Sequence, residues 1–173
     1  MKLKLGLVAL LATLNLWAIT VGKIPKEVNL NGENGGMAKD GSQWNSKSLK
    51  DKVYVMFYVD PDEKDLNEDF SDALKAKHYR EKGAFGSIAI INLAATWKPN
   101  IIIESILKSK QKEFPETIYV KDKNSVLVKE WNLADDNNDI LIFDKEGKVL
   151  FYKAGKMSED DMQKAFTIIE EHI

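Results

Sequence analysis

The sequence predicts an α/β domain in which parallel strand–helix–strand units are followed by a C-terminal β-hairpin and a closing helix. Two continuous apolar runs, residues 53–59 and 87–93, have the composition of strands buried on both faces of a sheet. A helix-start signal follows each run. Two more apolar runs, 140–144 and 149–152, are separated only by a tight turn with a glycine, which is typical of an antiparallel hairpin.

The first helix is expected directly after the 53–59 strand. Asp60 is a suitable N-cap, Pro61 suits the first helical position, and Glu63 stands where a capping box places its acidic residue. Apolar residues then recur at helical spacing between Leu66 and Leu74. The pattern predicts a helix that starts at Pro61 and buries this stripe.

The remaining elements follow in order. Pro99 opens a second helix, a third strand is expected at 117–120, and residues 126–133 form a short helix or turn. Ser158 caps the last helix, with Asp161 in place of the glutamate of a capping box.

An Asn- and Gly-rich stretch at 31–36 precedes the first strand unit. Such a run favours a turn or loop, and it lacks the Lys-Ser/Thr ending of a phosphate-binding P-loop. We therefore expect a plain loop at these residues, after a short extended segment at 23–30.

The N-terminus has the pattern of an export signal. Lys2 and Lys4 precede an apolar run at 5–16, and Ala18 is a small residue at a plausible cleavage point. Residues 1–18 are predicted to be a signal peptide, which directs the protein to the periplasm.

The alternative is an uncleaved anchor, because 5–21 is just long enough to span a bilayer. In that case this segment would be the protein's only membrane attachment. Either way, residues 19–173 are expected to form one domain.

Composition narrows the function. The 173 residues contain no cysteine and carry a formal net charge of -2. Without a thiol, neither disulfide exchange nor peroxidatic chemistry is possible, and a lipoprotein signal is excluded. A slightly acidic chain argues against nucleic-acid binding, which needs clustered Lys and Arg.

Several segments resemble known proteins. The lead-in at 44–53 and the hairpin at 140–149 are similar to those of exported thioredoxin-like reductases and peroxiredoxin relatives. A closer resemblance, to the YtfJ family, is carried by residues 58–68, 130–133, 144–149 and 158–161. It implies a three-layer α/β/α sandwich of thioredoxin type with a mixed central sheet, and a periplasmic location. The family has no established activity.

The same resemblance locates what the chain lacks. It places the two redox cysteines of a thioredoxin near Asp62 and Asp65, and the cis-proline before the hairpin strand at Asn138. A cis bond before a non-proline residue costs about 2.5–4 kcal/mol, so a trans bond is expected there.

Two acidic segments are expected to lie side by side in this fold, one after the 53–59 strand and one before the hairpin. Their carboxylates suggest a hard-cation site as one hypothesis, with Asp62, Asp65, Asp136 and Asp139 as candidate ligands. A calcium loop would need a glycine where Ile140 stands. The alternative is that these residues cap a helix and fill a loop.

Other chemistry-bearing residues favour ordinary roles. His78 is expected at the exposed end of the first helix, without a nucleophilic serine nearby in the sequence. Trp44 and Trp131 are expected to pack inside, whereas Trp97 is the best candidate for an exposed contact residue.

The sequence thus favours a non-catalytic periplasmic binding or interaction module without a cofactor, whose partner, a periplasmic protein or peptide, it does not identify. The alternatives are an enzyme of unknown reaction, assisted by a cation at the acidic loops, and a cytoplasmic regulator with a hydrophobic N-terminal helix. No basic recognition helix supports the last of these.

Overall fold

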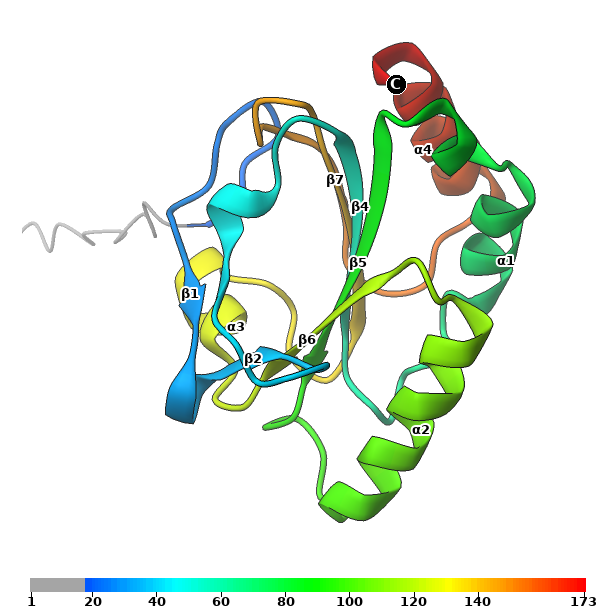
Figure 1. Cartoon of the computed structure of the whole chain (residues 1–173). Helices are drawn as coiled ribbons and strands as arrows, with labels where there is room; N and C mark the ends of the chain where they lie inside the picture. Colours follow the sequence, from blue (N-terminus) through cyan, green and yellow to red (C-terminus); the bar gives the residue numbers. More distant parts are fainter. Residues whose placement is uncertain (1–17) are drawn as a thin grey trace, which may run out of the picture.

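The structure, a computed structural model, describes residues 18–173 (Figure 1). The predicted signal peptide therefore lies almost wholly outside the described residues. The described part contains no helix that is long and apolar enough to cross a membrane.

A mixed sheet of six strands forms the centre, in the order β2-β6-β5-β4-β7-β8. Strands β4, β5 and β6 run parallel, β7 is antiparallel to β4, and β2 and β8 close the two edges as antiparallel neighbours. A separate two-stranded ribbon pairs β1 with β3. The strands are β1 (Asn29–Leu30), β2 (Gly35–Met37), β3 (Trp44–Asn45), β4 (Val53–Val59), β5 (Phe85–Asn92), β6 (Ile118–Asp122), β7 (Asn138–Phe143) and β8 (Val149–Lys153).

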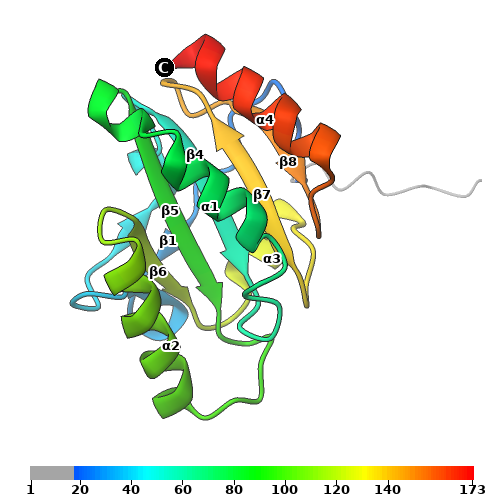
Figure 2. The same ribbon diagram turned by 90° about the vertical axis from the view of Figure 1, so that its right-hand side faces the viewer.

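Helices cover both faces of the sheet. They are α1 (Glu68–Ala76), α2 (Asn100–Glu113), α3 (Val126–Trp131) and α4 (Glu159–His172). Figures 1 and 2 show α1, α2 and α4 on one face, and α3 with the N-terminal ribbon on the other. The crossovers from β4 to β5 and from β5 to β6 step in the same direction, so right-handed connections put α1 and α2 on the same face.

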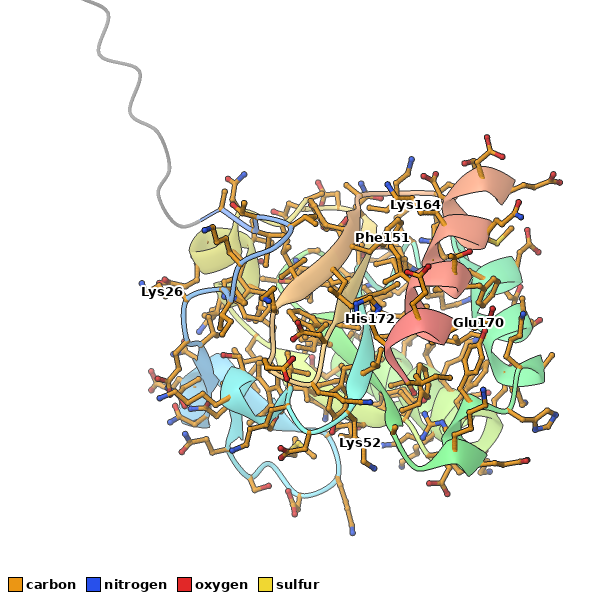
Figure 3. All side chains as sticks on the ribbon, turned by 90° about the horizontal axis from the view of Figure 1, so that it is seen from above. Lys26, Lys52, Phe151, Lys164, Glu170 and His172 are labelled. Carbon is orange, nitrogen blue, oxygen red and sulfur yellow. The ribbon has the colours of Figure 1, made fainter. Side chains whose placement is uncertain are left out.

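Each face has its own core because side chains alternate along the strands. On the α3 face, Met56 and Tyr58 of β4 pack with Trp131. On the other face, Val55 packs with Phe70 of α1 and with residues of α4. Figure 3 shows side chains filling the space between α4 and the sheet, where Phe151 of β8 is buried. The predicted three-layer sandwich is confirmed.

The predicted start of the first helix is wrong. Helix α1 begins at Glu68, and residues 61–67 form turns instead. Asp60 Oδ1 accepts a hydrogen bond from the Asp62 amide at 2.8 Å, which makes a local turn rather than a helix cap. The buried Asn67 amide then ties the end of this segment to Asn138 O at 3.1 Å, and its oxygen accepts from the Met157 amide at 2.9 Å.

The glycine-rich stretch is not a plain loop either. Gly35–Met37 is the edge strand β2, paired with β6. A Cβ on Gly35 would lie 1.8 Å from the Lys121 carbonyl oxygen, and the φ of Gly35 is +130°. Glycine therefore serves here to let two strands approach closely, a role that turn composition alone does not reveal.

The C-terminal elements are confirmed. β7 and β8 form the predicted hairpin, with Gly147 in its turn at a φ of +83°. The Ser158 hydroxyl accepts from the Asp161 amide at 3.1 Å, while Asp161 Oδ2 accepts from the Ser158 amide at 3.0 Å. These reciprocal bonds form the predicted capping box at the start of α4.

Helix α3 is held by a residue that no sequence pattern singles out. Asp122, at the end of β6, is fully buried. Its carboxylate accepts from the amides of Val126 at 2.9 Å and Leu127 at 3.0 Å, and from the Tyr58 hydroxyl at 3.1 Å. Asp122 therefore caps the first turn of α3 from the neighbouring strand.

Candidate functional site: an apolar slot between α1 and α2

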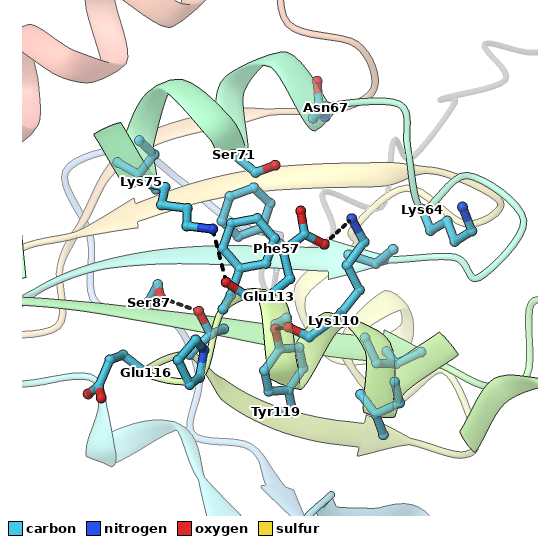
Figure 4. A pocket seen from close by; sticks show the side chains of 18 of the residues that line it. Phe57, Lys64, Asn67, Ser71, Lys75, Ser87, Lys110, Glu113, Glu116 and Tyr119 are labelled. Atoms are coloured by element: carbon cyan, nitrogen blue, oxygen red, sulfur yellow. Dashed lines mark hydrogen bonds and ion pairs between the residues drawn. The ribbon is translucent and has the colours of Figure 1, made fainter. Parts of the chain in front are cut away.

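A cavity of about 420 Å³ lies between α1 and α2, above the centre of the sheet. Figure 2 shows the two helices crossing the same face with β5 between them. Phe57 of β4 and Ala89 and Ile91 of β5 form the floor of this slot. In Figure 4, Phe57 lies at its centre, between Ser71 of α1 and Tyr119 of β6.

The slot exists because the two helices do not close over the strands. Helix α2 buries Ile103 and Leu107, and α1 buries Phe70 and Leu74. Between them Phe57, on the central strand β4, is only half-buried. The walls and floor are mainly hydrocarbon, and apolar concavities with few polar groups are the usual form of small-molecule sites.

Two lysines link the helices across the slot. Lys75 Nζ of α1 donates to the Glu113 carbonyl at 3.1 Å and lies 4.9 Å from the centre of the Phe114 ring. Lys110 Nζ of α2 lies 3.6 Å from a carboxylate oxygen of Glu68. Exposed links of this kind each contribute about 0–1 kcal/mol, so they hinder the separation of α1 and α2 only weakly.

One end of the slot carries a half-buried arginine. Arg80 lies in the short 3₁₀ segment after α1, and it donates to the Glu116 carbonyl at 2.5 Å. It also donates to the hydroxyl oxygens of Ser87 and, at 3.3 Å, Thr117. Burial lowers the pKa of Arg80, and the nearby Glu116 charge opposes this. Every partner that Arg80 bonds is a neutral oxygen.

The other end is formed by two asparagines, Asn67 before α1 and Asn138 at the start of β7. Asn138 Nδ2 donates to the Glu63 carbonyl at 3.3 Å, which fixes the orientation of its amide. Asn138 Oδ1 is buried and accepts no hydrogen bond from the described residues. This end therefore presents an unused acceptor beside Asn67.

The two acidic segments do lie side by side, as predicted, because the Asp60 amide donates to the Asn137 carbonyl at 2.8 Å. The four candidate ligands nevertheless do not converge. Asp62 pairs with Lys98 and accepts from the Thr96 hydroxyl.

Asp65 pairs with its neighbour Lys64, and Asp136 is exposed. Asp139 is fully buried, where its Oδ2 accepts from the Ala134 amide at 2.8 Å and the Tyr152 hydroxyl at 3.1 Å. Within residues 18–173 no three acidic or histidine side chains are grouped to hold a metal ion.

The acidic ends have a consequence for stability instead. Asp60 is 4% exposed. Burial, followed by the negative charges of Asp136 and Glu63, raises the pKa of the Asp60 carboxyl to about 6 from its ordinary 3.8. The pKa of the Asp60 carboxyl is higher in the folded than in the unfolded state. The contribution of this carboxyl to folding stability is therefore complete below pH 3.8 and is lost as the pH rises through about 6.

We therefore expect Asp60→Asn to stabilise the protein above pH 7 and to have little effect at pH 4. The amide keeps the oxygen that accepts from Asp62. The gain should be roughly 1–2 kcal/mol after screening by water, or about 3–6 °C in Tm. Thermal unfolding at several pH values measures it, with exposed Asp65→Asn as the control. An equal shift at pH 4 and pH 8 would contradict the assignment.

The remaining candidates lie where the sequence placed them. His78 is exposed at the end of α1. Trp44 and Trp131 are buried, and Trp131 Nε1 donates to the Lys26 carbonyl at 2.7 Å. Trp97 is 87% exposed, and Ile101 on the following helix is 79% exposed.

Sequence reasoning missed the slot. The signal was the series of small residues on the helix-facing side of β5, Ser87 and Ala89, within a strand predicted to be buried. Small side chains beneath a helix leave space that neighbouring residues do not always fill.

The thiol positions of a thioredoxin carry other residues in this chain. Asp62 and Asp65 lie in the turn between β4 and α1, and Asn138 is the first residue of the hairpin strand β7. The peptide bond before Asn138 is trans, like every other peptide bond in the described part of the chain. The chain thus has a thioredoxin-like fold and contains no cysteine. It belongs to the family described as "Bacterial protein of unknown function (YtfJ_HI0045)", whose profile matches residues 23–172.

Relatives and solved structures agree with this assignment. An uncharacterized protein of Haemophilus influenzae is 29% identical over 129 residues, covering 73% of this chain and 70% of the relative. The uncharacterized protein YtfJ of Escherichia coli is 25% identical over 131 residues, with the same coverage.

The thioredoxin domain of a thiol-disulfide oxidoreductase from Bacteroides vulgatus superposes with a TM-score of 0.60 at 14% identity, covering 90% of this chain and 100% of that one. A peroxiredoxin-like protein from Aquifex aeolicus gives a TM-score of 0.59 at 14% identity, covering 90% and 89%. At this identity the likeness concerns the fold alone. The chemistry named for the first of them needs thiols that this chain lacks.

Proposed function

We propose that this chain is a non-catalytic periplasmic binding module whose ligand site is the slot between α1 and α2. The observation that carries the proposal is the half-buried Phe57, Ala89 and Ile91 at the centre of the sheet, beneath a cavity of about 420 Å³. Leaving this much apolar surface uncovered forgoes stability, at about 25 cal/mol per Å², and a bound apolar molecule would recover it.

The contacts of the slot hydroxyls support binding rather than nucleophilic catalysis. Ser71 donates to the Glu68 carbonyl at 2.9 Å. Ser87 interacts with Arg80 and, at 2.8 Å, with Thr117. A catalytic serine needs an adjacent general base, and neither hydroxyl bonds to an imidazole or carboxylate among the described residues.

Titration with a neutral apolar fluorophore, N-phenyl-1-naphthylamine, tests the proposal. We expect one saturable site per chain with a Kd below about 200 µM, since a ligand of this size gains about 5 kcal/mol at 0.3 kcal/mol per non-hydrogen atom. Fluorescence that stays at the level of the free probe, with a folded protein, would refute a small-molecule site.

The periplasmic location is proposed from the leader, Lys2, Lys4 and the apolar run at 5–16. Mass spectrometry of the extracytoplasmic fraction should give a mature chain that starts near Ile19. A chain that retains Met1 and is found only in membranes would instead support an uncleaved anchor.

A further inference from the structure

The two ends of the slot differ in charge, and the arginine end indicates the charge of the ligand. The Arg80 guanidinium is half-buried beside hydrocarbon. No ion pair among residues 18–173 includes it, and its bonds go to the Glu116 carbonyl and to the hydroxyl oxygens of Ser87 and Thr117. The Glu116 charge lies near the guanidinium, but no carboxylate bonds to it, so an anion that arrives with a ligand would further offset the cost of burying this cation.

Chemistry at this end suits a carboxylate. A guanidinium has five donors in a planar fork that matches two carboxylate oxygens. The Ser87 and Thr117 hydroxyls next to it are hydrogen-bonded to each other at 2.8 Å, which uses one of their two protons and leaves the other hydroxyl free to donate to the anion. Lys75, on the α1 wall, adds a second positive charge whose bonds also go to a carbonyl oxygen and an aromatic ring.

The middle of the slot selects the body of the ligand. From Ser87 to Ile91 along β5 the floor runs for about 13 Å, at about 3.3 Å per residue. Ala89, Ile91 and Phe57 offer only carbon over this length. A peptide or sugar would leave its polar groups without partners there, at about 1–3 kcal/mol each, whereas a hydrocarbon chain would lose nothing.

We propose that the slot binds an elongated aliphatic carboxylic acid, with its carboxylate at Arg80, Ser87 and Thr117 and its chain along the floor toward Asn138. A length of 13 Å corresponds to a straight chain of about ten carbon atoms. The inference rests on the proposed binding function and names its ligand class.

The described part of the chain begins on the face of the sheet opposite the slot. The described residues begin at Ala18, and the Ile19 amide donates to the Trp131 carbonyl at 2.8 Å, on the α3 face of the sheet. Figure 1 shows this end of the chain on the opposite side of the sheet from α1 and α2.

Competition for the bound N-phenyl-1-naphthylamine tests the ligand class. Decanoate and 1-decanol have the same chain and differ in the head group. On the wild-type chain we expect decanoate to displace the probe at a concentration at least tenfold lower than 1-decanol. Arg80→Gln, which keeps an amide donor for Glu116 and Ser87, should reduce that preference to less than threefold and leave displacement by 1-decanol unchanged.

The matched control is Lys82→Gln, which removes an exposed cation from the same 3₁₀ segment outside the slot and should leave the preference intact.

Equal displacement by the two compounds on the wild-type chain would overturn the carboxylate inference while the binding site stands. Failure of both compounds to displace a bound probe would overturn the ligand class. Failure of the probe itself to bind would remove the proposed function as well. A preference that persists in Arg80→Gln would overturn the placement of the carboxylate. The wild-type comparison decides the ligand class even if Arg80→Gln does not fold.

Discussion

Replacing Asp122 with alanine is expected to lower the free energy of unfolding by about 3–5 kcal/mol, because four donors lose their acceptor at once, and two of them, the Leu127 amide and the Tyr58 hydroxyl, are buried. The fully buried carboxylate satisfies the Val126 and Leu127 amides at the start of α3 and the Tyr58 hydroxyl of β4. Leaving these donors unpaired costs more than the bonds themselves contribute. Burial, followed by the Asp122 charge, raises the pKa of Tyr58, so its hydroxyl stays protonated as a donor.

Urea unfolding followed by circular dichroism measures this loss as a lower midpoint at an unchanged slope. Tyr58→Phe removes one of the four bonds and should cost about 1 kcal/mol. Asp72→Ala, at an exposed position of α1, should stay within about 0.5 kcal/mol of the wild type. If Asp122→Ala were no worse than Asp72→Ala, Asp122 would not be the cap of α3.

Ala89→Leu should have the largest effect on binding. Ala89 lies at the centre of the slot floor, on β5 between Phe57 and Ile91 of the same surface. A leucine would extend into the space that the ligand needs, so probe affinity should fall by at least thirtyfold. The added side chain also fills an apolar cavity, so the free energy of unfolding should increase by about 0.5–2 kcal/mol. Tm should therefore rise rather than fall.

Ala154→Leu is the matched control, because Ala154 is exposed in the loop after β8 and outside the slot. It should leave probe affinity unchanged. The combination of a more stable protein with lost binding distinguishes filling of the slot from damage to the fold. Unchanged affinity in Ala89→Leu would place the probe elsewhere on the chain.

Local chemistry made much of the fold predictable. The buried runs became β4 and β5, the glycine turn became the β7–β8 hairpin, and Ser158 with Asp161 caps α4. In each case the residues that decide the structure are close together in the sequence. The resemblance added the layer arrangement, and with it the adjacency of the two acidic segments.

The predictions from sequence were wrong where residues distant in the sequence determine the local structure. The first helix starts at Glu68 because Asn67 is held by Asn138 and Met157, more than seventy residues away. Gly35 belongs to a strand because Asp122 of β6 lies opposite it. Neither partner can be recognised from the helix-start or turn pattern alone.

The candidate sites illustrate the same limit. The acidic residues were evident in the sequence, but their side chains bind different partners. Asp62 pairs with Lys98, whereas Asp139 accepts a hydrogen bond from Tyr152. The slot depends on how far apart α1 and α2 settle on the sheet. That spacing is a property of packing, and no spacing of residues in the sequence encodes it directly.

Methyl NMR of the wild-type chain during titration with N-phenyl-1-naphthylamine tests the central claim most directly, because it locates the bound molecule. The chain contains its own control. Ile91, Ile106 and Leu107 line the slot, whereas Ile101 and Ile102 lie exposed on the same helix, near Trp97. We predict saturable shifts at Ile91, Ile106 and Leu107, with Ile101 and Ile102 nearly unchanged. Shifts confined to Ile101 and Ile102 would show that the probe binds the exposed patch, and would contradict the slot as the binding site.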